Sequence, residues 1–259
     1  MTSRNQVASS VVRRRKRKSS QKNLSYSIPK TFLVKKIAIL QSNYIPWKGY
    51  FDIINHVDEF IFYDDVQYTK NDWRNRNKIK SANGSLWLTI PVRQENLSQK
   101  INETKVSQDN WAEKHWKSIS LNYSKAPFFH LYKDKLEKFY SEVKTPLLSE
   151  INLSAIELLN SFLGINTVLT SSSDYKLIAG KNERLIDLIF QAGGTHYLSG
   201  PSAKDYIKED LFNEAGIEIS WMDYSGYPEY PQLNPPFEHA VSVLDLILNT
   251  GPDALKYMK

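Results

Sequence analysis

Residues 37–63 carry the pattern that most restricts the fold, because a buried strand, a helix and a second buried strand follow one another there. Residues 37–40 and 60–63 are short apolar runs, and residues 47–57 place apolar side chains three and four positions apart. Strands joined through a helix are expected to run parallel in one sheet. The alternation returns later, with strands expected at 167–170, 196–198 and 217–222 and helices at 183–192 and 202–215. The pattern predicts an α/β fold with a mostly parallel sheet flanked by helices.

The middle of the chain has a different character, because helical spacing continues through successive segments. Residues 111–121, 128–140 and 147–163 each place apolar side chains three and four positions apart. Before them, the pair Asn83-Gly84 is typical of the turn of a β-hairpin and lies between two strand-like segments. We therefore expect a mainly helical insertion around 111–163.

Charge is distributed unevenly along the chain. Residues 1–36 hold 11 of the 34 Lys and Arg residues and no acidic residue, so residues 37–259 hold 23 basic against 28 acidic side chains, a net charge of −5. A nucleic-acid-binding domain is usually basic over its own surface, so we expect no nucleic acid partner for the folded domain. Residues 1–34 are rich in Ser, Arg and Lys without apolar periodicity, which predicts a disordered basic tail. Alternatively, the tail is a start-site artefact, since the chain from Val34 reads like the natural start of a bacterial protein.

Residues 35–259 are expected to form a single domain. Two features that the sequence lacks limit its cellular location and its chemistry. No stretch approaches the ~18 apolar residues that a membrane-spanning helix needs, so we expect no transmembrane segment. The chain has no Cys, which excludes disulfides, thiolate metal sites and Cys nucleophiles. Both features fit a cytoplasmic protein.

Short polar segments follow the predicted strands, and they are the first candidates for a binding site. Ligands of parallel α/β sheets bind outside the carboxyl ends of the strands. In this chain those ends carry Gln41-Ser42-Asn43, Asp64-Asp65, Thr170-Ser171-Ser172, Ser199-Gly200 and Asp223-Tyr224. If the strands are parallel, these residues gather at one edge of the sheet. Alternatively, they only cap the helices that follow.

Asp64 and Asp65 are candidates for chemistry, since adjacent carboxylates can bind Mg²⁺ or supply a general base. A divalent ion needs more oxygen ligands than this pair, and no third carboxylate is clearly placed, so we predict no metal site. His115 is a further candidate for the general base, or else a structural His in a helix. None of the five His residues has the spacing of a zinc-binding helix. In the simpler interpretation, one Asp is solvated and the other caps a helix.

A segment after the second strand is the densest in hydrogen-bonding side chains. If this segment is a strand, Arg74, Arg76 and Lys78 share one face. Asn75 and Asn77 then share the other face. A row of cations suits a phosphate or a carboxylate, although the same charges would also protect an edge strand.

A second candidate for anion binding opens the helix predicted at 202–215. Backbone N–H groups of the turn Ser199-Gly200-Pro201-Ser202 could hold a phosphate, and Lys204 lies in the first turn of the helix. The turn matches neither the dinucleotide-binding pattern nor the Walker phosphate loop. Its ligand therefore stays open at the level of sequence.

Several segments resemble the WbqC-like family of bacterial and archaeal proteins. The matching segments are residues 41–51, 63–68, 73–77, 122–129, 197–201 and 242–245, and the resemblance extends from about residue 35 to 259. It implies a role near nucleotide-sugar or glycan modification, because family members resemble products of O-antigen and other surface-polysaccharide gene clusters. It implies no particular catalytic residue. The first segment is also faintly similar to nucleotidylyltransferases, but the pair of histidines that those enzymes place on phosphates is missing.

The leading hypothesis is a cytoplasmic transferase of O-antigen or surface-polysaccharide biosynthesis that adds an acyl or aminoacyl group to the amino group of a nucleotide-activated sugar. Asp64, Asp65 or His115 would remove a proton from the amine. The expected substrate-binding residues are Gln41, Asn43, Tyr44, Trp47, Gln67, Trp73, Arg74, Asn75, Arg76, Ser199, Gly200 and Lys204. One alternative is an ATP-dependent activating or nucleotidyl-transferring enzyme, and another is a non-enzymatic binding or scaffold protein of the polysaccharide machinery. The sequence specifies no cofactor, donor, acceptor or oligomeric state.

Overall fold

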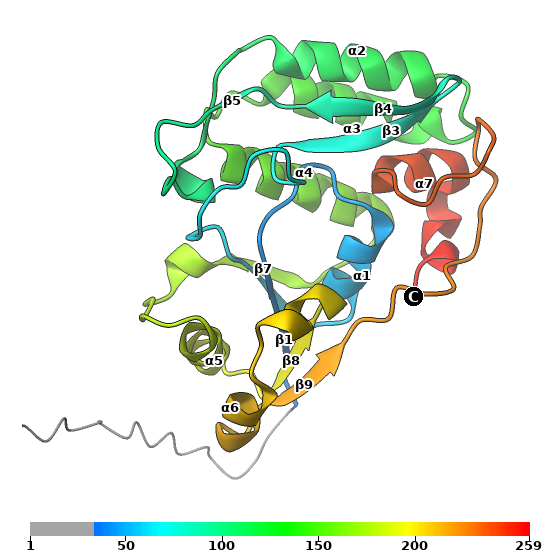
Figure 1. Cartoon of the computed structure of the whole chain (residues 1–259). Coiled ribbons are helices and arrows are strands. Elements are labelled where there is room, and N and C mark those ends of the chain that lie inside the picture. Colours follow the sequence, from blue (N-terminus) through cyan, green and yellow to red (C-terminus); the bar gives the residue numbers. More distant parts are fainter. Residues whose placement is uncertain (1–33) are drawn as a thin grey trace, which may run out of the picture. The chain divides into compact units, whose positions relative to one another are not determined.

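The structure is a computed structural model that describes residues 34–259. A parallel sheet lies at the centre of this part of the chain (Figure 1). The tail predicted at 1–34 falls, apart from its last residue, outside the described residues. The five strands are β1 (Lys36–Leu40), β2 (Glu59–Phe62), β7 (Val168–Ser171), β8 (His196–Ser199) and β9 (Glu218–Trp221). Their order is β7-β2-β1-β8-β9, and every neighbouring pair is parallel. The predicted α/β fold with a mostly parallel sheet is confirmed.

The strand order places a crevice at the centre of the sheet. The chain adds β2 and then β7 on one side of β1, and it adds β8 and then β9 on the other side. The segments that leave β1 and β8 therefore turn to opposite faces of the sheet. Ligands of doubly wound α/β proteins bind at this switch point, outside the carboxyl ends of the two strands.

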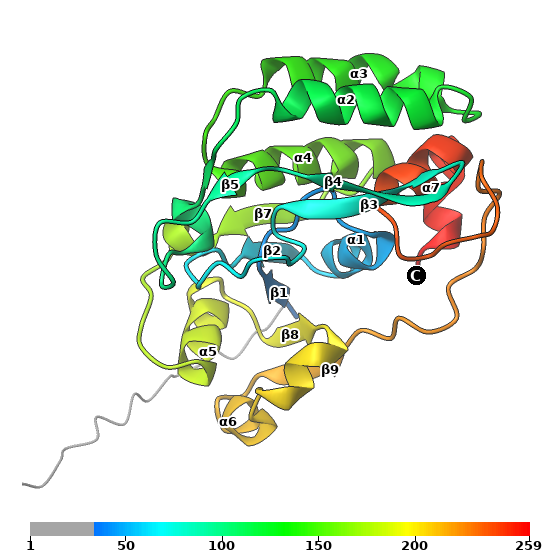
Figure 2. The same cartoon turned by 45° about the horizontal axis from the view of Figure 1, so that its top comes forward.

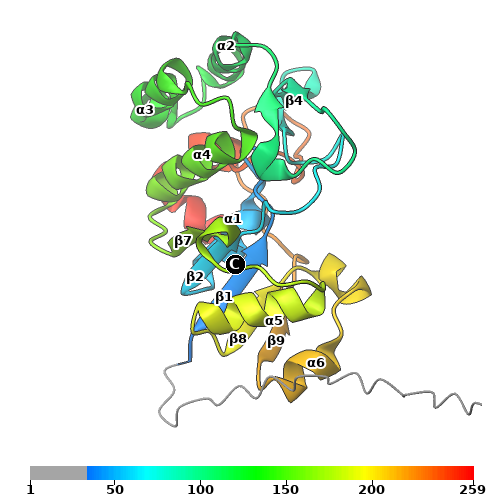
Figure 3. The ribbon, with the colours of Figure 1, turned by 90° about the vertical axis from the view of Figure 1, so that its left-hand side faces the viewer.

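Helices cover both faces of the sheet (Figure 3). The helices α1 (Lys48–Asn55) and α4 (Leu148–Leu163) share one core with Ala38 of β1, and α5 (Asn182–Gln191) and α6 (Glu209–Glu214) share another with Ile37 and Ile39. All three β1 side chains are buried. Because both faces of the strand are covered, β1 is apolar at consecutive positions instead of alternating.

The chain between β2 and β7 forms the predicted insertion. A hairpin of β3 (Arg76–Ser81) and β4 (Gly84–Thr89) comes first, and its turn residue Gly84 has φ +104°, which favours glycine. The segments that follow are β5 (Val92–Arg93), η1 (Ile101–Glu103), β6 (Lys105–Val106), α2 (Trp111–Tyr123), α3 (Phe129–Glu142) and α4. α2 packs against α3 and β3 (Figure 2). The predicted hairpin and helical region are confirmed.

The remaining elements are short. The turn η2 (Ser172–Asp174) follows β7. The helix α7 (Val243–Thr250) continues into η4 (Gly251–Tyr257), and α7 and η4 both pack against α4. Within residues 34–259, no helix combines the length and the apolar character needed to cross a membrane.

The helix predicted at 202–215 is wrong as a single element. The chain instead forms η3 (Pro201–Asp205), leaves the helical conformation at Tyr206, and starts α6 only at Glu209. The buried Asn182 side chain donates to the carbonyl of Tyr206 at 3.2 Å and accepts from the N–H of Lys208 at 2.9 Å. A side chain from α5 thus holds backbone groups that a continuous helix would have paired internally.

Candidate functional site

A pocket of about 870 Å³ opens at the carboxyl ends of β1 and β8, at the switch point of the sheet. Its strand-end residues are Leu40 and Gln41 after β1 and Ser199 and Gly200 after β8. Gly200 lies close to a pocket aromatic, because a β-carbon at this position would be 3.4 Å from the hydroxyl of Tyr224. The place agrees with the rule for doubly wound sheets, and the volume suits a ligand of nucleotide size.

Four tyrosines line the pocket, and three of them lie on the segments that follow strands or turns, whereas Tyr197 belongs to β8. Tyr63 follows β2, Tyr206 follows η3 and is 51% exposed, and Tyr224 follows β9. The ring of Trp47 contacts Tyr224 edge-to-face at 5.1 Å between ring centroids. Burial, together with the charge of Asp52, raises the pKa of Tyr224. The Tyr224 hydroxyl therefore stays protonated at neutral pH and can donate a hydrogen bond to a ligand.

Two cations lie at the start of α5 and line the same pocket. Lys181 is exposed, and Arg184 is fixed by hydrogen bonds from Nε to the carbonyl of Ile178 at 2.6 Å and from Nη1 to the hydroxyl of Tyr63 at 3.3 Å. No ion pair within residues 34–259 joins either cation to a carboxylate. Both charges are thus available to an anionic ligand, beside the positive end of a helix.

Asp65 supplies a negatively charged group to the same pocket. It accepts hydrogen bonds from Ser172 at 2.8 Å, Asn102 at 3.1 Å and Ser173 at 3.2 Å, and the ammonium of Lys100 lies 3.7 Å away. Burial raises the pKa of Asp65, but these hydrogen bonds and the Lys100 charge outweigh it and hold the pKa below its ordinary value. Asp65 is therefore ionised at neutral pH and suits the binding of a cationic or hydroxyl group.

The Gln41 amide is held in place by Arg74. Nη2 of Arg74 donates to Oε1 of Gln41 at 2.6 Å, and Nη1 donates to Oδ1 of Asn43. The carboxylate of Asp72 lies 3.6 Å from Arg74 and balances its charge. Because Oε1 of Gln41 is occupied by Arg74, the amide of Gln41 keeps Nε2 as its donor for a ligand.

Comparison with known proteins assigns the chain to a family. The profile of the WbqC-like protein family matches residues 41–257. The chain belongs to the WbqC-like family. A relative, the "Uncharacterized protein Rv1507c" of Mycobacterium tuberculosis, is 49% identical over 227 residues, which cover 87% of this chain and 98% of the relative. No solved structure matches the chain.

The part matched to the WbqC-like family includes every lining residue of the pocket except Ile39 and Leu40. Of the predicted site residues, the pocket is lined by Gln41, Asp65, Gln67, Ser199 and Gly200. Sequence reasoning missed Tyr63, Lys181, Arg184 and Tyr206. The only sequence signal for the two cations was their place at the start of a helix that follows a strand, where anions bind in this class of fold.

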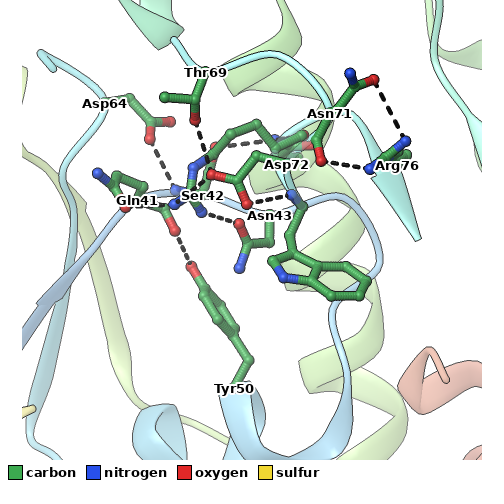
Figure 4. Close-up of polar contacts among 12 residues, drawn as sticks. Gln41, Ser42, Asn43, Tyr50, Asp64, Thr69, Asn71, Asp72 and Arg76 are labelled. Carbon is green, nitrogen blue, oxygen red and sulfur yellow. Dashed lines mark hydrogen bonds and ion pairs between the residues drawn. The ribbon is translucent and has the colours of Figure 1, made fainter. Parts of the chain in front are cut away.

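Asp64 lies behind the pocket and does not line it. Its side chain is buried and accepts a hydrogen bond from the backbone N–H of Ser42 at 2.8 Å (Figure 4). Burial raises the pKa of Asp64, although the hydrogen bonds from Ser42 and the charge of Arg74 act against the shift. The adjacent carboxylates therefore differ in role: Asp64 joins the loops after β1 and β2, and Asp65 faces the pocket.

His115 and Tyr44 are also placed away from the pocket. His115 is buried, with Nδ1 2.8 Å from the hydroxyl of Tyr44 and Nε2 3.2 Å from the carbonyl of Thr89. Burial lowers the pKa of His115 to about 4. The ring is therefore neutral at neutral pH and connects the loop after β1 to the hairpin and α2.

The predicted row of Arg74, Arg76 and Lys78 on one strand face is wrong for Arg74. β3 begins only at Arg76, and Asn71, with φ +60°, turns the chain before it. Arg76 and Lys78 do share a face of the hairpin, where both lie against the ring of Trp87. The three cations therefore do not form one anion site.

The remaining predicted residues make other contacts. Asn75 is buried and donates to the carbonyl of Ile90 at 2.8 Å, and Lys204 lies 5.4 Å from the ring centre of Trp221. Trp73 is 43% exposed and stacks on another indole outside the pocket. Within residues 34–259, no group of three or more His, Asp and Glu side chains is arranged to hold a metal ion.

Proposed function

We propose that this chain is a transferase that acts on a nucleotide-activated amino sugar and adds an acyl or aminoacyl group to its amine, in the biosynthesis of O-antigen or another surface polysaccharide. The observation that carries the proposal is the pocket at the switch point of the sheet, with cations at one helix end and a carboxylate on a neighbouring strand end. A sugar nucleotide has the same distribution of chemistry: a diphosphate, flat or ring-shaped groups at both ends, and an amine. A cytoplasmic location is part of the proposal.

The diphosphate is assigned to the side of the pocket with Lys181, Arg184 and the turn after β8. Arg184 is already held at Nε by the carbonyl of Ile178 and at Nη1 by the hydroxyl of Tyr63, so its remaining N–H groups can bind a phosphate without a large loss of side-chain entropy. Lys181 is exposed and adds a second positive charge. Gly200 and Ser202 line the same space, and their backbone N–H groups are assigned as neutral donors, whereas Pro201 between them has none.

The rings of the substrate are assigned to the tyrosines, and their hydroxyl groups to the glutamine side chains. Tyr206 and Tyr224 offer flat surfaces for a base or a pyranose ring. Gln41 directly follows β1, and Gln67 lies in the loop after β2. Nε2 of Gln67 donates to the carbonyl of Leu97 at 2.5 Å, so its amide oxygen is the group left for a ligand. Polar groups of this kind fix the orientation of a ligand in an otherwise apolar pocket.

Asp65 is assigned to the amine. In acyl transfer, the nitrogen of the amine forms a bond to the acyl carbon, the leaving group departs from that carbon, and the nitrogen loses a proton. The ionised carboxylate of Asp65 accepts a hydrogen bond from the neutral amine, which is the form that attacks. The proton that the nitrogen loses as the bond forms passes by way of Asp65 to the leaving group, which departs protonated. Asp65 is the carboxylate among the predicted acids that lines the pocket, whereas Asp64 and His115 do not.

A thermal-shift and titration experiment tests the proposal. The protein is titrated with UDP- and dTDP-linked amino sugars, and separately with ATP–Mg²⁺ and acyl-CoA. A ligand that binds only the folded state raises the melting temperature. We expect a shift with an amino-sugar nucleotide, and a loss of about tenfold in its affinity in Arg184→Gln, because one charge-assisted contact is removed. The matched control is Lys117→Gln, an exposed residue of α2 outside the pocket.

Three other outcomes would contradict the proposal in different ways. A shift with ATP–Mg²⁺ and none with sugar nucleotides would favour an activating or nucleotidyl-transferring enzyme. Silence with every ligand would favour a non-enzymatic binding or scaffold role. Equal affinities in Arg184→Gln and Lys117→Gln would remove the phosphate assignment even if a sugar nucleotide binds.

A further inference from the structure

Two exposed tryptophans lie together on the insertion, outside the pocket. Trp73, before β3, and Trp87, on β4, stack with their ring centroids 5.6 Å apart and an angle of 29° between their planes. They are 43% and 41% exposed. Large aromatic rings usually gain stability by burial, and adjacent exposed indoles are typical of a surface that binds a ligand.

Two cations border the indoles. The guanidinium carbon of Arg76 lies 4.4 Å from the ring centre of Trp87, and Nζ of Lys78 lies 5.3 Å from the same centre. In the register of the hairpin Lys78 is directly opposite Trp87, so these side chains share one face of the sheet. The nearest acidic residue in sequence, Asp72, is 3.6 Å from Arg74 and is balanced by it. The surface is therefore locally positive, although residues 37–259 carry a net charge of −5.

The platform, defined as Trp73, Arg76, Lys78 and Trp87, is held rigidly from behind. The opposite face of the hairpin carries Asn77, which donates to the carbonyls of Tyr44 at 3.2 Å and Ile45 at 2.9 Å and is buried. The carbonyl of Trp73 also accepts from the N–H of Tyr44 at 3.0 Å. These contacts fix the backbone on which both indoles stand, so a ligand would meet a surface that is already formed.

We infer that the platform binds an acidic oligosaccharide, that is, a glycan whose sugar rings carry carboxylate groups. The apolar face of a pyranose ring packs on an exposed indole surface, and the exposed parts of the two stacked indoles can contact consecutive rings. Arg76 and Lys78 lie over the ring of Trp87, and their charges can pair with the carboxylates of the glycan. Arg76 also donates a hydrogen bond to the carbonyl of Asn71, which holds the guanidinium in place. An uncharged apolar peptide would give neither cation a counter-ion, and a nucleic acid would meet an acidic body around a small basic area.

The platform is separate from the pocket, because none of its four side chains lines it. The inference therefore goes beyond the proposed reaction and does not depend on it. The platform would recognise an extended glycan on the surface of the insertion, whatever ligand the pocket binds.

The experiment measures the binding of oligogalacturonate, an acidic oligosaccharide, to the full chain by isothermal titration. A second readout is the decrease in acrylamide quenching of tryptophan fluorescence when the oligosaccharide binds. Maltohexaose serves as the neutral sugar and oligo(dT) as the nucleic acid. We expect oligogalacturonate to bind best, with an affinity that falls with added salt. Trp87→Ala is expected to lower this affinity about tenfold, and Trp87→Phe to restore part of it, because a ring remains.

Matched variants separate binding from folding. Arg76→Gln combined with Lys78→Gln is expected to remove most of the salt dependence while leaving both indoles in place. Leu131→Ala, at a residue of α3 that is 51% exposed, is the control and leaves binding unchanged. The inference is overturned if oligogalacturonate does not bind, if Trp87→Ala and Leu131→Ala bind it equally well, or if oligo(dT) binds more tightly through the same residues.

Discussion

Asn182 holds the segment that carries Tyr206 into the pocket, and its replacement tests the reasoning about this part of the fold. The side chain is 7% exposed and makes two hydrogen bonds, to the carbonyl of Tyr206 and from the N–H of Lys208. Each intramolecular hydrogen bond contributes roughly 1 kcal/mol, and a buried group left unpaired costs more. Asn182→Ala is therefore expected to lower the free energy of unfolding by about 2–3 kcal/mol.

The assay is urea unfolding followed by circular dichroism, combined with hydrogen exchange of backbone amides. The urea slope is expected to stay constant, because the surface exposed on unfolding does not change. The amide of Lys208 is expected to lose protection, since its acceptor is removed. Asn182→Asp keeps an acceptor for Lys208 but loses the donor to Tyr206, so its effect should be intermediate.

The control is Asn166→Ala, because Asn166 is exposed and makes a single longer hydrogen bond to the carbonyl of Gly164 at 3.3 Å. Its effect should stay within about 0.5 kcal/mol. If Asn182→Ala also changes stability by less than this, and the exchange of the Lys208 amide is unchanged, then Asn182 is not what interrupts the helix between η3 and α6.

Three further changes test other parts of the structure. Gly251→Ala should lower the free energy of unfolding by about 2–4 kcal/mol in the urea assay, because Gly251 has φ +58° and a β-carbon would be 2.3 Å from the ring of Phe128. Burial lowers the pKa of Lys48 from 10.5 to about 8. As the pH increases, the folded state therefore loses this proton before the unfolded state does, and the free energy of unfolding should rise between pH 8 and 10.5. Lys48→Met should abolish this rise when unfolding is measured at several pH values. Arg74→Met should lower the affinity for a sugar nucleotide about fivefold in titration, because it releases the Gln41 side chain. An unchanged affinity would show that this amide does not contact the ligand.

Several features could be predicted because local sequence contains them. The apolar runs that become β1 and β2 and the helical spacing between them are signals read over a few residues, and burial of both sheet faces produces them directly. The turn at Gly84 is similarly local. Parallel pairing then brings the polar strand ends together, and for this reason Gln41, Asp65 and Ser199 were found from sequence to lie near one another.

Other features depended on contacts between distant parts of the chain. His115 looked like a possible base, but the hydroxyl of Tyr44 and the hairpin enclose it and make it neutral. Arg74 looked like part of a cationic row, but the strand begins two residues later and its guanidinium turns to Gln41. In both cases the side chain's partner lies more than 30 residues away, and only folding brings it near.

The sequence by itself determined the order of strands and helices, the insertion and the positions of the polar strand ends, because these follow from periodic burial and short-range backbone preferences. The tertiary structure decided which polar groups face the pocket. It brought Lys181 and Arg184, at the start of α5, beside the ends of β1 and β8, and it broke one expected helix through Asn182. The physical reason is that a side chain's exposure, charge state and hydrogen bonds are set by neighbours in space, which a single sequence does not specify.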